Sequence, residues 1–341
     1  MFKNVRMPLR ASFACSLALS FTMISAQSKP ALADWKDELG AFRVGIVGGS
    51  DPATLLAKVE PFRLALEEKL EVPVSFLPTP DLRSLILAHA EGRNEYAILS
   101  ASAYASAFAS CECLEPLVSA KSADGSYGVY SIIITRKNTG LNSINDLPGK
   151  KIVALGKNST LGYSYPIFSL QKQNVDLMKG ETEFLFAETA DKALARFANG
   201  EGDALIGWSS RAGEASTGYS RGTLRQLADA NPGILAGLTV LWTSDLVPQR
   251  VHSIKKNLVA EPKKRIKELL LQMFETDPVA FDVIEPDFNG GFTPVAQSDF
   301  SQLVEFAKSP IPKPLLDSGD ASNAENETTD TDLSVKPKTG N

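Results

Sequence analysis

The stretch YAILSASAYASAFASCECL, residues 96–114, decides the fold of this chain. It begins with a short apolar segment, residues 96–99, and continues into alanine and serine around Tyr104. The first part predicts a buried strand and the second part predicts a helix. Open α/β sheets bind their ligands at the carboxyl ends of strands that run into helices in this way. We therefore expect a binding edge directly after Leu99.

Cys111 and Cys113 close this stretch and are the most unusual chemical feature of the chain. A disulfide between them would enclose a single residue, so it would add little stability through loop entropy. Such a bridge also needs a bent backbone to bring the two sulfurs into range. The spacing therefore favours a chemical role for the pair over a structural one.

The first 33 residues are typical of a signal peptide. Basic residues between Lys3 and Arg10 precede an apolar segment, 11–26, that is too short to span a membrane. The tripeptide Ala-Leu-Ala at 31–33 offers a small-x-small cleavage site. We expect residues 1–33 to be removed and the mature protein to reach the periplasm.

Composition excludes two classes of partner. The chain of 341 residues carries a net charge of −5 and has only short basic clusters, which argues against nucleic acid. No later apolar segment approaches the length that crosses a bilayer, so we expect a protein that is not membrane-embedded. Residues 311–341 are rich in Pro, Ser, Asn, Asp, Glu and Thr, and this composition predicts a disordered tail.

Two α/β units follow one another along the mature chain. The first alternates strands with helices, at 42–47, 55–70, 72–77, 81–90 and 96–99. The second does the same, at 130–135, 151–155, near Pro166, at 182–186, 190–198 and 204–206. A strand at 238–243 and helices at 263–274 and 300–307 complete the pattern. Such alternation implies parallel sheets.

We predict two lobes, one formed by residues 34–130 plus 238–310 and the other by residues 131–237. The chain would cross between them twice, near 126–136 and near 237–244. Two such strand-like crossings make a hinge, and a ligand would bind between the lobes.

Several segments together resemble the periplasmic phosphate/phosphonate-binding family of ABC-transporter solute receptors. The resemblance covers roughly residues 42–307 and is carried by VGIVGGSDP (44–52), SASAYASA (100–107), ADGSYGVYSIIITRKNTGLNSINDLPGKKI (123–152), KNSTLGYSYP (157–166), GEGDALIGW (200–208) and VLWTSDLVP (240–248). It implies a two-lobe α/β periplasmic-binding-protein fold of type II, with a mixed sheet flanked by helices in each lobe. It also implies a receptor without catalytic activity or cofactor.

The chain departs from this family at the site that holds the phosphoryl group. The family typically uses a Ser-Thr-Ser-Gly turn at a helix N-terminus, where amides and hydroxyls face an anion. Here the turn reads Ser159-Thr160-Leu161-Gly162, so that leucine replaces the third hydroxyl. A histidine usual in the family shortly before the helix at 190–198 is missing, whereas Asp203 is retained. These losses argue against a phosphonate ligand.

The sulfur atoms of Cys111 and Cys113 would take the place of the lost hydroxyl and histidine donors as ligand-binding groups. Thiolates select soft ions, and trivalent arsenic oxyacid is uncharged near neutral pH, so it needs no anion cradle. The combination resembles the arsenite-binding branch of the family, the periplasmic sensors that report arsenite to a membrane histidine kinase. This resemblance implies Cys111 and Cys113 as As(III) ligands, with an oxygen donor such as Glu112 as the third. An adventitious disulfide and a site for another soft metal remain as alternatives.

Five further residues are predicted ligand contacts: Gly49, Tyr104, Ser159, Thr160 and Trp208. Each has a plainer interpretation as a turn glycine, a core aromatic, a helix cap or an interface aromatic. His89 and His252 lack partners at metal-ligand spacing, and we expect them to be structural or solvent-facing.

Our hypothesis is a non-enzymatic periplasmic receptor that binds arsenite and reports it to the periplasmic domain of a sensor histidine kinase that regulates arsenite oxidation. The alternative is a solute-binding protein that delivers phosphonate, phosphite or phosphate to an ABC permease. A nucleophile elbow, a P-loop and a full dinucleotide fingerprint are all missing from the sequence, so catalysis has no support.

Overall fold

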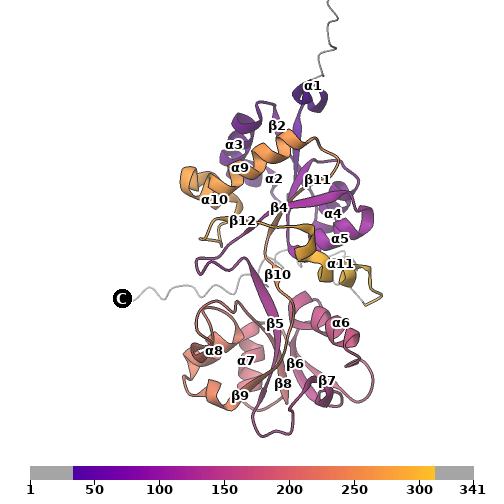
Figure 1. Cartoon of the computed structure of the whole chain (residues 1–341), viewed down its shortest axis with the longest axis vertical. Helices are drawn as coiled ribbons and strands as arrows, with labels where there is room; N and C mark the ends of the chain where they lie inside the picture. Colours follow the sequence, from indigo (N-terminus) through magenta and orange to yellow (C-terminus); the bar gives the residue numbers. More distant parts are fainter. Residues whose placement is uncertain (1–33, 312–341) are drawn as a thin grey trace, which may run out of the picture. The chain divides into compact units, whose positions relative to one another are not determined.

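Apolar strands and amphipathic helices alternate along the chain and form two mixed sheets covered by helices (Figure 1). The computed structural model describes residues 34–311. The predicted signal peptide and the predicted tail from residue 312 onward lie outside the described residues. The α/β fold class with a mixed sheet in each half is confirmed.

The first sheet has the strand order β12-β4-β11-β3-β1-β2. Its bounds are β1 Phe42–Val47, β2 Val74–Thr79, β3 Tyr96–Leu99, β4 Leu114–Ala120, β11 Val251–Lys255 and β12 Phe292–Pro294. β1 is parallel to β2 and to β3, whereas β11 is antiparallel to both β3 and β4. Because helices cover both faces, β1 and β3 are nearly continuous apolar runs.

Two apolar clusters hold helices against this sheet. The cluster on one face includes α3 (Glu60–Leu70), α9 (Ala260–Thr276) and α10 (Pro278–Ile284). The other cluster includes α4 (Leu82–Ala90), α5 (Ala101–Cys111) and α11 (Ser301–Lys308). Two shorter helices precede them, α1 (Trp35–Leu39) and α2 (Pro52–Lys58).

The second sheet has the strand order β10-β5-β8-β6-β7, and β9 also pairs with β5. Its strands are β5 Gly128–Arg136, β6 Lys151–Leu155, β7 Glu183–Ala187, β8 Ala204–Ser209, β9 Leu238–Thr243 and β10 Val247–Pro248. Its helices are α6 Tyr165–Lys172, α7 Ala190–Ala198 and α8 Thr223–Ala230. The short helical turns are η1 Ile144–Asp146, η2 Thr160–Ser164, η3 Ala215–Thr217, η4 Ile234–Gly237 and η5 Gln297–Phe300.

Some expected elements differ from the observed ones. The helix predicted over 55–70 is two helices, because Pro61 has no N–H to continue α2 and instead occupies the first turn of α3. The strand 238–243, which we assigned to the first lobe, pairs with β5 and therefore lies in the second sheet. β4 and β11 were not predicted as strands, and their antiparallel pairing makes the first sheet mixed rather than parallel.

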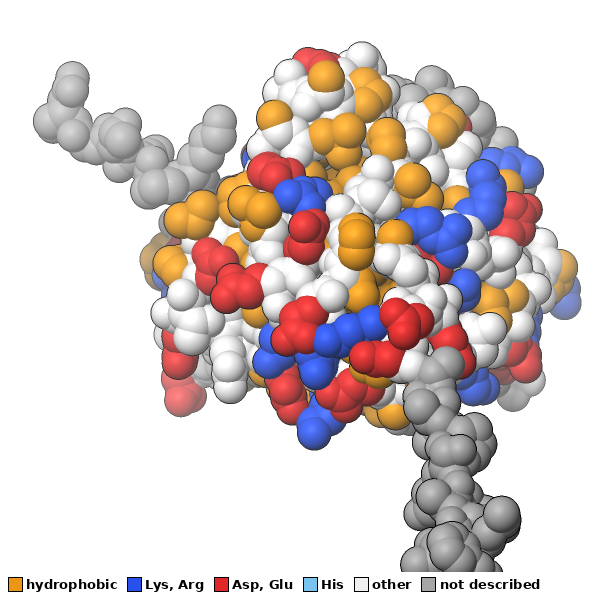
Figure 2. Space-filling view, turned by 90° about the horizontal axis from the view of Figure 1, so that it is seen from above, with side chains coloured by type: hydrophobic (Ala, Val, Ile, Leu, Met, Phe, Trp, Pro, Cys, Tyr) orange, Lys and Arg blue, Asp and Glu red, His pale blue; other side chains and the backbone are white. Residues whose placement is uncertain are grey.

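Opposite charges are interspersed on the surface, as Figure 2 shows for one face of the molecule. Exposed or half-buried ion pairs join Arg63 to Glu60 and Arg265 to Glu261 on the helices α3 and α9. Such pairs contribute little stability singly. None of the helices between residues 34 and 311 has the length and apolar character to cross a membrane.

The two crossings between the sheets lie directly against each other. Val247 pairs with Val129 and Pro248 pairs with Gly128, in antiparallel register. A Cβ atom added to Gly128 would lie 2.6 Å from the carbonyl oxygen of Val247 and 2.7 Å from the Leu246 side chain. The close approach of the two backbones therefore requires glycine at this position.

We expect Gly128→Ala to lower the free energy of unfolding by about 1–3 kcal/mol, because the added methyl group forces the two crossings apart. Urea denaturation followed by circular dichroism measures this difference. The matched control is Gly156→Ala, whose added Cβ meets nothing within 4 Å and should change the stability by less than about 0.5 kcal/mol. Equal stability of the two variants would contradict the close-approach argument.

Candidate functional site

A cavity of about 630 Å³ lies at the carboxyl ends of β1 and β3. Its walls include residues 48–49 after β1, residues 100–102 at the start of α5, and residues 160–161 in η2. Residues 249–250, which lead into β11, complete this part of the wall. Elements that pair in both sheets therefore line one cavity, at the edge where α/β proteins bind ligands.

Two of the predicted contacts, Gly49 and Thr160, line this cavity. Gly49 has a φ of +57°, a left-handed conformation that glycine adopts without strain. Tyr104 is fully buried away from the cavity wall, with its ring against Phe300 at a centroid distance of 4.8 Å. Its hydroxyl donates a hydrogen bond to Gln297, and burial raises the pKa of that hydroxyl. The contacts of Tyr104 are thus those of a core residue.

Ser159 and Trp208 also lie outside the cavity wall. Ser159 precedes η2, and its hydroxyl accepts a hydrogen bond of 3.0 Å from the Gly162 amide. Trp208 is 9% exposed, and the guanidinium of Arg221 lies 5.8 Å from its ring centroid. The Trp208 indole nitrogen has no hydrogen-bond partner among residues 34–311. That these two residues contact a ligand stays a prediction.

The N-cap residues of the three helices that begin at the cavity differ in charge. The carboxylates of Asp51 and Asp81 cap α2 and α4 by accepting hydrogen bonds from the amides of Thr54 and Ser84. Ser100, a neutral residue, caps α5 in the same way. Because a carboxylate already balances the positive ends of α2 and α4, only α5 among these three presents an uncompensated dipole to an anion.

The cysteine pair lies at the other end of α5. This helix of 11 residues begins at the cavity and extends about 16 Å at 1.5 Å per residue, so neither cysteine lines the cavity. The sequence predicts both thiols at the ligand edge, but the helix between Ser100 and Cys111 separates them from the cavity. Whether the sulfurs bind a ligand of their own stays a prediction.

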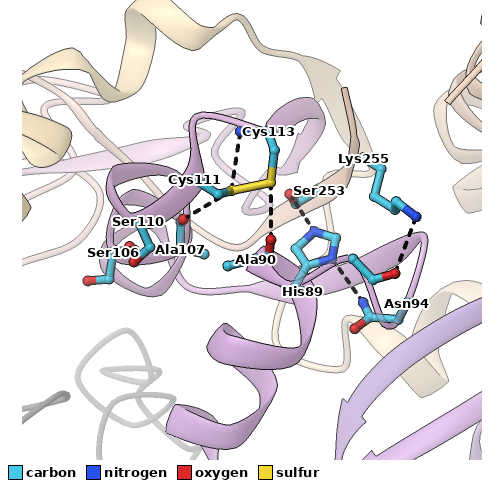
Figure 3. Close-up of a disulfide and its surroundings, with 11 residues drawn as sticks. His89, Ala90, Asn94, Ser106, Ala107, Ser110, Cys111, Cys113, Ser253 and Lys255 are labelled. Carbon is cyan, nitrogen blue, oxygen red and sulfur yellow. Dashed lines mark hydrogen bonds between the residues drawn. A yellow bond between two sulfur atoms is a disulfide. The ribbon is translucent and has the colours of Figure 1, made fainter. Parts of the chain in front are cut away.

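Figure 3 shows the two cysteines joined by a disulfide, with Cα atoms 5.0 Å apart. Glu112 between them has a φ of +51°, and this left-handed residue supplies the bend that the spacing requires. The Cys113 sulfur lies 3.3 Å from the carbonyl oxygen of Ala90 at the end of α4. Glu112 forms a 2.7 Å ion pair with Lys308, which lowers the pKa of its carboxyl group.

Both histidines are buried, which agrees with a structural role and excludes a solvent-facing one. The Asn94 amide donates to Nδ1 of His89 at 2.9 Å, so Nε2 carries the proton and donates to the Ser253 hydroxyl at 3.0 Å (Figure 3). Burial lowers the pKa of His89 to about 4. Within residues 34–311 no three His, Cys, Asp or Glu side chains form a group that could hold a metal ion.

The arrangement of two mixed sheets joined by two crossings, with a cavity at the strand ends, is the one expected of a solute-binding protein. Residues 44–300 match the model of the family described as "ABC transporter, phosphonate, periplasmic substrate-binding protein". The chain belongs to this family. Its members are periplasmic and bind a ligand without a cofactor.

Two curated relatives support the family membership. The chain is 27% identical over 304 residues to the phosphonates-binding periplasmic protein of Escherichia coli, covering 87% of this chain and 83% of that protein. It is 23% identical over 270 residues to the phosphate-import protein PhnD of Mycolicibacterium smegmatis, covering 77% and 81%. Among solved structures, XAC2383 from Xanthomonas citri bound to chloride ion shares the fold, with a TM-score of 0.52, 17% identity, and coverage of 79% of this chain and 96% of that one.

Among the polar residues of the cavity wall that sequence reasoning missed are Ser102, Gln249 and Arg250. Ser102 had a usable signal, since it lies in the first turn of the helix that begins after the binding edge. Gln249 and Arg250 had none, because they reach the cavity only through the unpredicted antiparallel pairing of β11.

We expect the buried His89 ring to make the protein less stable in acid. Its folded-state pKa of about 4 lies below the ordinary value of 6.5, so its stabilising effect is complete above pH 6.5 and is lost as the pH falls towards 4. This loss amounts to about 3 kcal/mol, because below pH 6.5 only the unfolded chain binds the proton readily.

Urea denaturation between pH 7.5 and pH 4 would measure this effect, with His89→Gln as the comparison. The variant should lose stability over this range by about 3 kcal/mol less than the natural protein. The carboxyl groups titrate in both proteins and cancel in the difference. Identical pH slopes would show that His89 is not held neutral.

Proposed function

We propose that this receptor binds a small phosphorus oxyanion, of the phosphonate, phosphite or phosphate class, and delivers it to an ABC permease. One observation supports the proposal most directly. The N-terminus of α5, whose dipole no capping carboxylate balances, lines the same cavity as Ser102 and Thr160, which both carry hydroxyl groups. Amides at a helix N-terminus and hydroxyl donors are the groups that bind such anions. The named activities of the two curated relatives agree with this ligand class.

The rest of the wall favours a ligand that carries a small apolar group. Leu82, Leu161 and Leu303 line the cavity, and Leu161 is the residue that replaces the third hydroxyl of the family's turn. An apolar group beside an anion suits the carbon substituent of an alkylphosphonate better than a fourth oxygen of phosphate. The sequence alone counts Leu161 against a phosphonate because a hydroxyl is lost, but its place in the cavity wall suits the carbon substituent, and we therefore propose phosphonates ahead of phosphate.

Titration of the protein of residues 34–341 with methylphosphonate, phosphite and phosphate by calorimetry tests the proposal. We expect Ser102→Ala combined with Thr160→Val to weaken binding by at least about tenfold, since hydrogen bonds to a charged group are lost. The matched control is Ser110→Ala, which removes a hydroxyl from the far end of α5, where it donates to the Ser106 carbonyl. Absence of heat with all three anions would eliminate this function.

We propose a second function for the cysteine pair, in which the reduced thiols bind As(III) and the bound form is recognised by the periplasmic domain of a sensor histidine kinase. Two observations support it: the Cα atoms of Cys111 and Cys113 are close enough for both sulfurs to reach one atom, and both side chains are half-buried. A dithiol reductant must first convert the disulfide to two thiols. Arsenous acid then forms two As–S bonds and releases two water molecules, keeping one hydroxyl as the third ligand.

Measurement of arsenic bound per chain after gel filtration tests this second function. We expect one As(III) per chain for the reduced protein, and none for the oxidised protein or for Cys113→Ser, because a single thiol cannot form the chelate. Since the pair lies outside the cavity, Cys113→Ser should bind methylphosphonate as the natural protein does. Equal arsenic uptake by the reduced protein and by Cys113→Ser would contradict the thiol site.

A further inference from the structure

Arg250 is the single Lys or Arg side chain among the described residues that line the cavity. It directly precedes β11, in which Val251 pairs with Leu99. The antiparallel register therefore brings Arg250 to the level of Ser100, beside the start of α5. A cation and the positive end of a helix thus lie at the same edge of the first sheet.

A buried chain of polar groups holds this arginine in place. Nε of Arg250 lies 2.9 Å from a carboxylate oxygen of Glu285, which is fully buried at the end of α10. Nε2 of His252 donates to the other oxygen at 2.9 Å, and the Tyr96 hydroxyl donates to Nδ1 of the same ring. Burial lowers the pKa of His252, and among the described residues Arg250 is the cationic partner of Glu285.

The outer side of the guanidinium is free to bind a ligand. Neither Nη1 nor Nη2 of Arg250 has a hydrogen-bond partner within residues 34–311, and the side chain is 27% exposed. With Nε fixed by Glu285, the two terminal nitrogens present a planar fork of donors. Such a fork matches two oxygens of a phosphonate or a similar oxyanion.

Gln249, the residue before Arg250, adds a buried acceptor to the same cavity wall. Its side-chain amide donates to the Ser122 hydroxyl at 3.3 Å, whereas its Oε1 has no partner among the described residues. Gln249 is 3% exposed and lines the cavity. A buried acceptor without a donor is costly, and a hydroxyl group on the ligand would remove that cost.

The charges around the cavity favour a ligand with one negative charge over a ligand with two. Asp51, Asp81 and Asp287 line the same cavity, and Glu285 already balances the charge of Arg250 from behind. A dianion would be repelled by these carboxylates, whereas a protonated monoanion supplies both an anionic oxygen and a hydroxyl donor.

We propose that Arg250 and Gln249 form the anion subsite of the cavity, in which Arg250 binds two ligand oxygens and Gln249 accepts a hydrogen bond from the protonated one. This subsite selects a singly protonated phosphorus oxyacid over a sulfonate, which has the same shape but no hydroxyl at neutral pH. This inference rests on the proposed binding of phosphorus oxyanions in this cavity. It identifies Arg250 and Gln249 as the residues that determine which oxyanion is bound.

Calorimetric titration with methylphosphonate and with methanesulfonate tests the subsite. We expect the natural protein to prefer methylphosphonate by at least about tenfold, since the sulfonate leaves Gln249 without a donor. Gln249→Met keeps the size of the side chain but removes the acceptor, and it should reduce this preference to near unity. A natural protein that binds both anions equally, or an unchanged preference in Gln249→Met, would overturn the role of Gln249.

Arg250→Lys keeps the charge but removes the fork, and it should weaken methylphosphonate binding by at least about tenfold. The matched control is Arg265→Lys, because Arg265 is 28% exposed in a comparable ion pair but lies on α9, outside the cavity wall. Thermal unfolding of each variant shows whether the fold is retained. If Arg250→Lys does not fold, the selectivity of Gln249→Met between methylphosphonate and methanesulfonate tests the subsite by itself.

Failure of the subsite and failure of phosphorus-oxyanion binding would give different results. Unchanged methylphosphonate binding in Arg250→Lys, together with weakened binding in the Ser102→Ala and Thr160→Val double variant, would overturn the subsite and leave the proposed function standing. Absence of methylphosphonate binding by the natural protein would overturn both.

Discussion

The antiparallel pairing of β11 with β3 is the interaction on which the rest of the cavity depends. It joins Val251 to Leu99 and Ile254 to Tyr96, so the chain that returns from the second sheet enters the middle of the first one. Residues just before β11 consequently meet the residues that follow β3. A single strand pairing thus brings together side chains that are about 150 positions apart in the sequence.

The same pairing builds a polar connection from the core to the cavity. His252 lies against Tyr96 and Phe292 in an otherwise apolar cluster, where an unpaired imidazole would be costly. The Tyr96 hydroxyl and the Glu285 carboxylate satisfy its two nitrogens, and Glu285 in turn orients Arg250. Burial that would be unfavourable for each group alone becomes less costly because each group has a partner in the next, although among the described residues Oε2 of Glu285 has only the ion-pair contact with Arg250.

Two different chemistries lie at the two ends of α5. Its first turn, with a neutral serine cap, lines the cavity and suits an anion. Its last residue is Cys111, which is half-buried and bonded to Cys113, and the Cys113 sulfur lies against the end of α4. The helix separates these ends by about 16 Å, so an oxyanion and a thiophilic ligand would not compete for the same atoms.

Local patterns in the sequence determined most strands and helices, the α/β class, and the place of Gly49 and Thr160 in the cavity wall, because strand period, helix caps and turn glycines depend on neighbouring residues. The cysteines lie away from the cavity because α5 continues as far as Cys111. The run of small residues after Leu99 indicates a helix but does not show where that helix ends. Only the tertiary structure decided that Arg250 and Gln249 reach the cavity, because strand order and register depend on contacts between distant segments.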